Sequence, residues 1–99
     1  FCKKIIDVSS LGNVHTLHLS CCDVIDVSVL GSVHTLDLRG CFNVTDVSAL
    51  GNVNTLDVSY CTRIIDVSTL KNVKKLKLTG CDKITDFSSL NNVQKLIFE

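Results

Sequence analysis

The sequence predicts a right-handed solenoid, in which five similar units stack and each adds one short strand to a single parallel sheet. Two observations lead to this fold class. The chain repeats with a period of 20 residues, and within each unit apolar residues recur at every third position before an apolar–polar–apolar ending. The first unit is one residue short, so the units are 2–20, 21–40, 41–60, 61–80 and 81–99. Because a unit this small cannot bury its own apolar face, it must pack against its neighbours.

The spacing inside one unit predicts short strands and little α-helix. The apolar positions of the second unit are Cys21, Val24, Val27, Leu30, Val33, Leu36 and Leu38. An amphipathic α-helix would mix steps of three and four, whereas uniform steps of three suit 3₁₀ or polyproline-like arcs. Only the final step of two, from Leu36 to Leu38, has the period of a strand.

Two segments carry a family resemblance. Residues 33–41 (VHTLDLRGC) resemble the leucine-rich-repeat pattern L-x-x-L-x-L-x-x-N/C-x-L, and residues 84–90 (ITDFSSL) resemble the arc of short internalin-type repeats. The near-identical 20-residue units also look like tandem repeats of large DNA viruses of amoebae. The resemblance implies a parallel sheet on a concave face, 3₁₀ or polyproline-like arcs on a convex face, and a scaffold that binds other proteins.

A cysteine opens every unit, where the resembled repeats usually carry asparagine. The cysteine ladder consists of Cys2, Cys21, Cys41, Cys61 and Cys81. The resemblance implies that these side chains point inward and bond backbone carbonyls, a place that suits a small buried thiol. We expect reduced, structural thiols and therefore a reducing, intracellular folding compartment, with a virion also compatible. Disulfides between neighbouring rungs and metal binding are the alternatives, although no C-x₂-C pair is present.

An aspartate also recurs in every unit, two residues before a serine. The aspartate ladder consists of Asp7, Asp26, Asp46, Asp66 and Asp86. A carboxylate at this spacing accepts backbone N–H groups in an Asx-turn, which would start each arc. The alternative is a calcium ladder, but the glycine-rich motif of calcium-binding β-rolls is absent from the sequence.

The three histidines offer two further hypotheses. His15 and His34 occupy the same position in adjacent units, so they are candidates for a shared metal ion. Later units carry Asn54, Lys74 and Gln94 there, which favours a solvated surface. His18 is one rung away from Asp37, and we expect the two to pair.

Composition and motifs exclude several function classes. The formal net charge is 0, which argues against nucleic acid as the partner of the whole chain, although residues 61–99 are basic and residues 1–60 acidic. No apolar run is long enough to enter and cross a bilayer. No phosphate-binding loop or catalytic constellation stands apart from the repeat, so we expect neither an enzyme nor a cofactor.

The positions that vary from unit to unit point to a binding surface. We expect outward side chains of the strands, and of the turns that follow them, to contact a protein partner on the concave face. The candidates are Thr16, His18, Thr35, Asp37, Arg39, Thr55, Asp57, Tyr60, Lys75, Lys77 and Lys95.

The leading hypothesis is a non-enzymatic protein-interaction module. The runner-up is a structural component of a larger assembly, such as a virion or surface layer, packed through its sides and open ends. An enzyme regulator with a metal site at His15 and His34 is a third. Because solenoids need polar caps, we also expect further repeats, a cap or a partner subunit at both ends, and a longer parent array.

Overall fold

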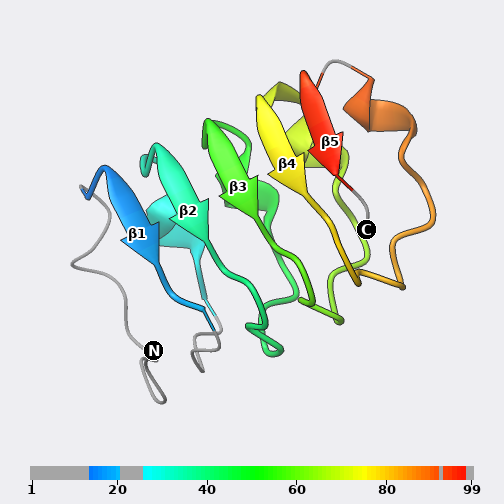
Figure 1. The fold of residues 1–99 in the computed structure, drawn as a ribbon, viewed down its shortest axis with the longest axis horizontal. Helices are drawn as coiled ribbons and strands as arrows, with labels where there is room; N and C mark the ends of the chain where they lie inside the picture. The colour runs from blue at the N-terminus through cyan, green and yellow to red at the C-terminus, as the bar shows by residue number, and fades with distance from the viewer. Residues whose placement is uncertain (1–13, 21–25, 92, 98–99) are drawn as a thin grey trace.

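The strands form one parallel sheet in chain order, as the sequence predicts. The structure is a computed structural model and describes residues 14–20, 26–91 and 93–97. The strand order is β1-β2-β3-β4-β5, and the strands lie side by side in Figure 1. Their bounds are β1 Thr16–His18, β2 Thr35–Asp37, β3 Thr55–Asp57, β4 Lys75–Lys77 and β5 Lys95–Ile97. Equivalent residues pair in register, so Leu36 lies beside Leu17 on one side and Leu56 on the other. Each sequence position therefore forms a row that crosses the sheet.

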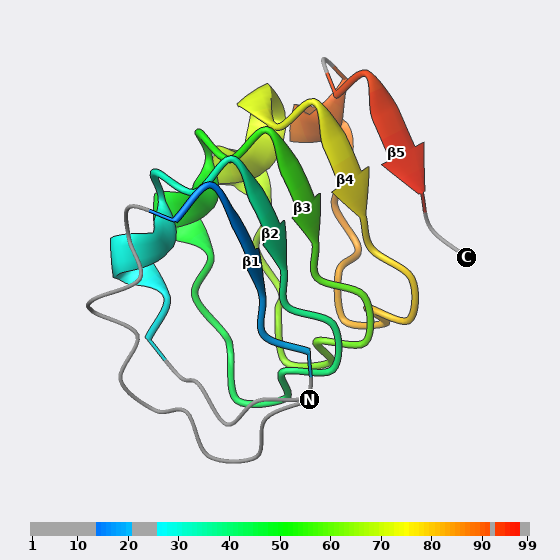
Figure 2. The same ribbon diagram turned by 60° about the vertical axis from the view of Figure 1, so that its left-hand side comes forward.

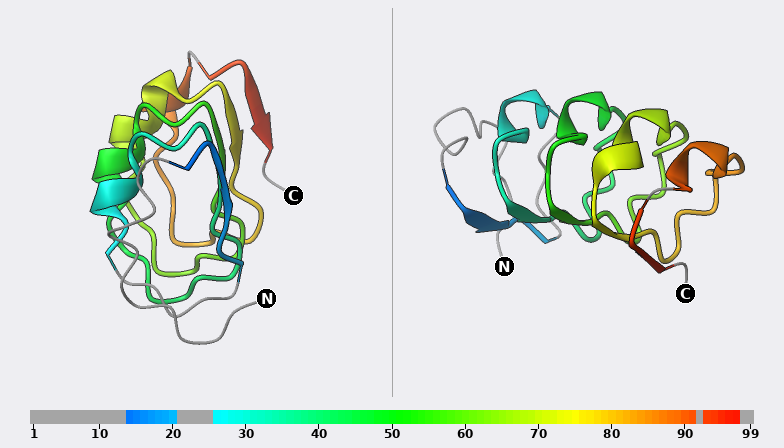
Figure 3. Two further views of the ribbon diagram at one scale, coloured as in Figure 1. Left: turned by 90° about the vertical axis from the view of Figure 1, so that its left-hand side faces the viewer. Right: turned by 90° about the horizontal axis from the view of Figure 1, so that it is seen from above.

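Short 3₁₀ segments lie on the side of the coil opposite the sheet (Figures 2 and 3). They are η2 Ser28–Leu30, η3 Ser48–Leu50, η4 Ser68–Asn72 and η5 Ser88–Leu90. The described residues contain no α-helix. The view along the array in Figure 3 shows one turn of the right-handed coil per unit, with the strand on one side and the arc on the other.

The period of three is a hydrogen-bond period as well as an apolar one. In the third unit the N–H of Cys41 donates to the carbonyl of Leu38 (3.1 Å), and the N–H of Val44 donates to that of Cys41 (3.2 Å). Leu50 bonds to Val47 in the same way, at 3.0 Å. These bonds join residue i to residue i−3, which is the 3₁₀ pattern. Before β3 begins, these bonds tie an inward residue to the previous inward residue at every step of the third unit except that from Val44 to Val47.

The core is the stack of inward residues, and it is aliphatic except for its cysteines. In the third unit it consists of Cys41, Val44, Val47, Leu50, Val53, Leu56 and Val58, all at most 1% exposed. The fourth unit repeats this with its equivalent residues at most 3% exposed. The inward positions predicted from the spacing are confirmed in these units. In the first and last described units the equivalent residues Leu17, Val93 and Leu96 are only partly buried.

Candidate functional site

The outer face of the sheet carries two rows of side chains on its strands. Residues flanking each central leucine point away from the core because successive side chains of a strand alternate between its faces. The row at the strand starts is Thr16, Thr35, Thr55, Lys75 and Lys95. The row at the strand ends is His18, Asp37, Asp57, Lys77 and Ile97. The outward placement expected for the strand residues of the candidate surface follows from this register.

A chain of opposite charges crosses the strand-end row. His18 Nδ1 lies 3.4 Å from Asp37 Oδ2, and Arg39 Nε lies 3.1 Å from Asp37 Oδ1. Arg39 Nε also lies 3.7 Å from Asp57 Oδ2, whose other neighbour is Lys77 Nζ at 3.9 Å. The expected pairing of His18 with Asp37 is present. With the histidine neutral, the two carboxylates are balanced by Lys77 and by Arg39 from the turn after β2, so the row and Arg39 together carry no net charge.

Both carboxylates are held in place by backbone as well as by cations. Asp37 Oδ1 accepts the backbone N–H of Arg39, and Asp57 Oδ1 accepts that of Ser59, each at 3.0 Å. Burial raises the pKa of Asp37, but hydrogen bonds from the Arg39 backbone, the Arg39 guanidinium and His18 outweigh it, so its pKa lies below the ordinary value. The Asp37 and Asp57 side chains are only 12% and 16% exposed. The acidic middle of the face is therefore satisfied internally and offers a partner little free negative charge.

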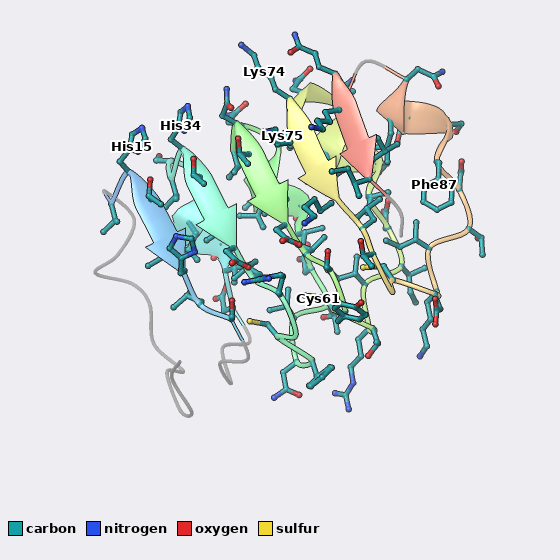
Figure 4. The ribbon with its side chains drawn as sticks, in the orientation of Figure 1. His15, His34, Cys61, Lys74, Lys75 and Phe87 are labelled. Atoms are coloured by element: carbon teal, nitrogen blue, oxygen red, sulfur yellow. The ribbon has the colours of Figure 1, made fainter. Side chains whose placement is uncertain are left out.

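The strand-start row leaves lysines without acidic partners. We call Lys74, Lys75 and Lys95 the basic patch. All three are exposed, and no carboxylate of residues 14–20, 26–91 or 93–97 forms an ion pair with them. Lys75 and Lys95 are direct neighbours in the β4–β5 register. Lys74 and Lys75 project near the start of β4 in Figure 4.

Two exposed aromatic rings lie beyond the strand ends. Phe42 is 55% and Tyr60 53% exposed, and both line a depression of about 390 Å³ with Ser20, Arg39 and Gly40. Tyr60 is a candidate from the sequence, whereas Phe42 is one that sequence reasoning missed. The signal for Phe42 was present, because an aromatic residue follows Cys41 where the later units have Thr62 and Asp82.

The two stacked histidines have a geometry unsuited to sharing a metal. The rings of His15 and His34 are 4.5 Å apart between centroids and 12° from parallel, side by side in Figure 4. Each Nδ1 contacts the hydroxyl of the following threonine, at 3.0 Å and 2.9 Å. Nitrogen lone pairs lie in the ring planes, so in parallel rings they run side by side and do not converge on one ion. Within the described part of the chain, no group of three or more His, Cys, Asp or Glu side chains is placed to hold a metal.

The cysteine ladder connects the turns that follow neighbouring strands. The thiols of Cys41, Cys61 and Cys81 donate to the carbonyls of Leu19, Leu38 and Val58, at 2.9, 2.9 and 3.1 Å. All three cysteines are buried and none is in a disulfide. Burial raises the pKa of Cys61 to about 12. Cys41 follows β2 and its acceptor Leu19 follows β1, and the other two pairs are arranged alike, so each thiol links the turns after two neighbouring strands. Cys2 and Cys21 lie outside the described residues.

The aspartate ladder starts the arcs. The carboxylates of Asp26, Asp46, Asp66 and Asp86 accept the backbone N–H of the serine two residues later, at 2.9, 2.9, 2.9 and 3.0 Å. This is the predicted Asx-turn geometry, and these hydrogen bonds lower the pKa of all four carboxyls. Asp7 lies outside the described residues. The ladder thus shapes the side of the coil opposite the candidate surface.

Comparison with solved structures supports the fold class. The chain is similar to an internalin (inlF) from Listeria monocytogenes, with a TM-score of 0.66 and 25% sequence identity over 94% of this chain. The match covers 31% of that internalin, so the chain spans about a third of its length. An internalin C2 (inlC2) from the same species aligns with 97% of this chain and 67% of its own, at 20% identity and a TM-score of 0.37. No protein-family model and no curated protein matches the sequence.

The structure and the first of these likenesses define a leucine-rich-repeat solenoid, a repeat fold whose stacked units form an extended surface suited to binding other proteins. The finer resemblance to viral tandem repeats stays a prediction. In the described part of the chain, no helix has the length and apolar character needed to cross a membrane.

Proposed function

We propose that this chain is a non-enzymatic protein-interaction scaffold that contacts its partner through the outer face of the sheet. The observation that supports the proposal is the contrast between the recurring backbone contacts of the arcs and the changing outward residues of the strands. On the arc side, the Asp-x-Ser hydrogen bond recurs in each described arc. On the sheet side, the outward rows change from threonine to lysine and from histidine to aspartate, lysine and isoleucine. Uniform residues maintain the coil, and varied residues supply a specific surface.

The rings beyond the strand ends support the same surface. Tyr60 and Phe42 add exposed apolar area next to Arg39, and aromatic and arginine side chains dominate the energetics of protein interfaces. We propose Tyr60 as the apolar contact at the edge of an interface that is otherwise polar.

Site-specific photo-crosslinking tests the proposal. A photoreactive amino acid replaces Thr55, which points outward on β3, and in a matched variant it replaces Thr69, which is exposed on η4. In the cells that make the protein, we expect covalent adducts with another protein from position 55 and none from position 69. Adducts only from position 69, or no adducts at all, would contradict the proposal. Adducts with further copies of this chain from both positions would favour a structural assembly instead.

A further inference from the structure

The described sheet face is electrically uneven, and its surplus charge is confined to one end. The carboxylates of the strand-end row, Asp37 and Asp57, are balanced by Lys77 from the same row and by Arg39 from the turn after β2. The strand-start row has threonine on β1, β2 and β3, and lysine on β4 and β5. The net positive charge of the described face therefore comes from Lys75 and Lys95, with Lys74 at the adjoining edge.

Two features show that this charge is not a by-product of the fold. Lys75 and Lys95 are paired in the β4–β5 register, where strands lie roughly 4.8 Å apart and like charges repel. Threonine at the same position of β3 shows that the fold does not require lysine there. The fold does not need this pair of lysines, and their mutual repulsion costs free energy in the isolated chain. An anionic group that binds between the two ammonium groups relieves that repulsion.

We infer that the basic patch of Lys74, Lys75 and Lys95 binds an acidic segment of the partner protein, with glutamate or aspartate carboxylates lying across the starts of β4 and β5. This inference rests on the proposed function and adds the chemical class of the partner. Lys77 lies on the same strand and is 3.9 Å from Asp57, so it is only loosely held and is within reach of the same segment.

A protein segment fits the patch better than a nucleic acid does. The outward residues of β4 and β5 are Lys75, Lys77, Lys95 and Ile97, with no aromatic ring on which a base can stack. The unpaired positive charge of the described face covers only β4 and β5. Proteins that bind nucleic acid instead follow the phosphate backbone with a longer stripe of basic residues. Ile97, half-buried at the end of β5, adds apolar surface of the kind that a peptide side chain contacts.

A binding assay with a defined peptide tests the inference. The probe is a fluorescent peptide in which glutamate alternates with serine, and the uncharged control has glutamine in place of glutamate. We expect the glutamate peptide to bind and the glutamine peptide not to bind. Affinity should fall as sodium chloride rises from about 50 mM to about 300 mM, because exposed charges are screened. The variant K75Q/K95Q should bind about three- to tenfold more weakly, as expected from the loss of two exposed ion pairs.

Two further variants separate the patch from general charge. K83Q removes one exposed lysine from the loop after Cys81, away from the sheet, and should bind like the unaltered chain. D57N leaves an amide oxygen to accept the Ser59 N–H but frees Lys77, so it should bind the glutamate peptide up to about threefold more tightly. This gain cannot result from a damaged fold.

Several outcomes would overturn the inference. They are no binding of the glutamate peptide, equal binding by K75Q/K95Q and K83Q, or tighter binding of single-stranded DNA or of phosphatidylserine vesicles than of the peptide. Failure of the proposed function is recognised separately. If position 55 still captures a partner and K75Q/K95Q does not reduce the capture, the proposed scaffold function is supported, whereas the inference that the basic patch binds an acidic segment is overturned.

Discussion

The ring of Tyr60 packs directly over the backbone of Gly80, one unit further along the coil. A Cβ atom placed on Gly80 would overlap Tyr60 Cδ1 and lie only 2.7 Å from Tyr60 Cε1. Both residues close the turn after a strand and both have positive φ, 63° for Tyr60 and 73° for Gly80. Glycine adopts this conformation freely, but a bulky side chain there is strained. Tyr60 is the one non-glycine residue of the described chain with positive φ.

This contact predicts a coupled effect of substitutions at the two positions. Gly80→Ala should lower the free energy of unfolding by about 1–2 kcal/mol or more, through left-handed strain and the clash with the ring. In a Tyr60→Gly background the clash is gone, so Gly80→Ala should cost about 1 kcal/mol less. Urea unfolding of the two single variants and the double variant measures this coupling. Strictly additive effects would show that the ring does not rest on Gly80.

The cysteine ladder predicts protection from alkylation. Cys61 is fully buried, its thiol donates to the Leu38 carbonyl, and its pKa of about 12 leaves almost no thiolate at neutral pH. Iodoacetamide should therefore modify Cys61 only when the chain unfolds, and mass spectrometry of native and urea-treated samples measures this. Cys81, at 7% exposure, is an internal comparison and should react sooner. Reaction of Cys61 at a rate independent of urea would contradict a closed coil around it.

The aspartate ladder predicts a loss of stability in acid. Hydrogen bonds from Ser48 hold the pKa of Asp46 below its ordinary value of 3.8, and Asp26, Asp66 and Asp86 behave alike. A carboxyl with a lowered pKa in the folded state stabilises the fold above its unfolded pKa, and this contribution disappears as pH falls through the folded pKa. The melting temperature should thus be level above about pH 5 and fall below about pH 4.

A substitution in the aspartate ladder tests whether these carboxyls cause the fall in melting temperature at low pH. Asp46→Asn should respond less steeply to acid than the unaltered chain, because its amide accepts the Ser48 N–H without titrating. A calcium titration separates the turn role from the cation-ladder alternative. If millimolar calcium raised the melting temperature, the aspartates would be cation ligands; we expect no change.

One serine is expected to be dispensable for stability. Ser59 is 2% exposed, and its hydroxyl oxygen is buried without a hydrogen-bond partner. Removing an unsatisfied buried polar group relieves its desolvation penalty, so Ser59→Ala should raise the free energy of unfolding by up to about 1 kcal/mol. Ser32→Ala, at an exposed turn position, is the matched control and should change it by less than about 0.5 kcal/mol. A clear loss of stability in Ser59→Ala would reveal a partner for the hydroxyl.

Much of the fold was predictable from local spacing. The step of three between inward residues such as Val47 and Leu50 predicted 3₁₀ or polyproline-like arcs, and the Leu36–Leu38 step of two predicted a strand. Both follow because backbone geometry ties the direction of a side chain to its place in the sequence. The 20-residue period then placed equivalent residues in register, as the pairing of Leu36 with Leu56 shows. The expected pairing of His18 with Asp37 followed from the same register.

The candidate surface was only half predictable. The outward positions followed from the alternation of the strands, but the distribution of free charge did not. Arg39 follows β2 in sequence, yet its guanidinium lies 3.1 Å from Asp37 and 3.7 Å from Asp57 on the next strand. The position of the Arg39 guanidinium depends on its rotamer and on the side chains that stacking brings close to it. The spacing of residues in the sequence predicts neither. Phe42 was missed for a similar reason, since its exposure depends on what packs beside the turn.

The sequence by itself thus determined the repeat, the inward rows and the register, because each of these follows from backbone geometry repeated every 20 residues. The tertiary structure alone decided which charges neutralise one another, leaving Lys75 and Lys95 without acidic partners among the described residues. It also decided that Tyr60 adopts a glycine-like conformation over Gly80. Those outcomes depend on distances of a few ångströms between side chains of different units, which only the stacked coil establishes.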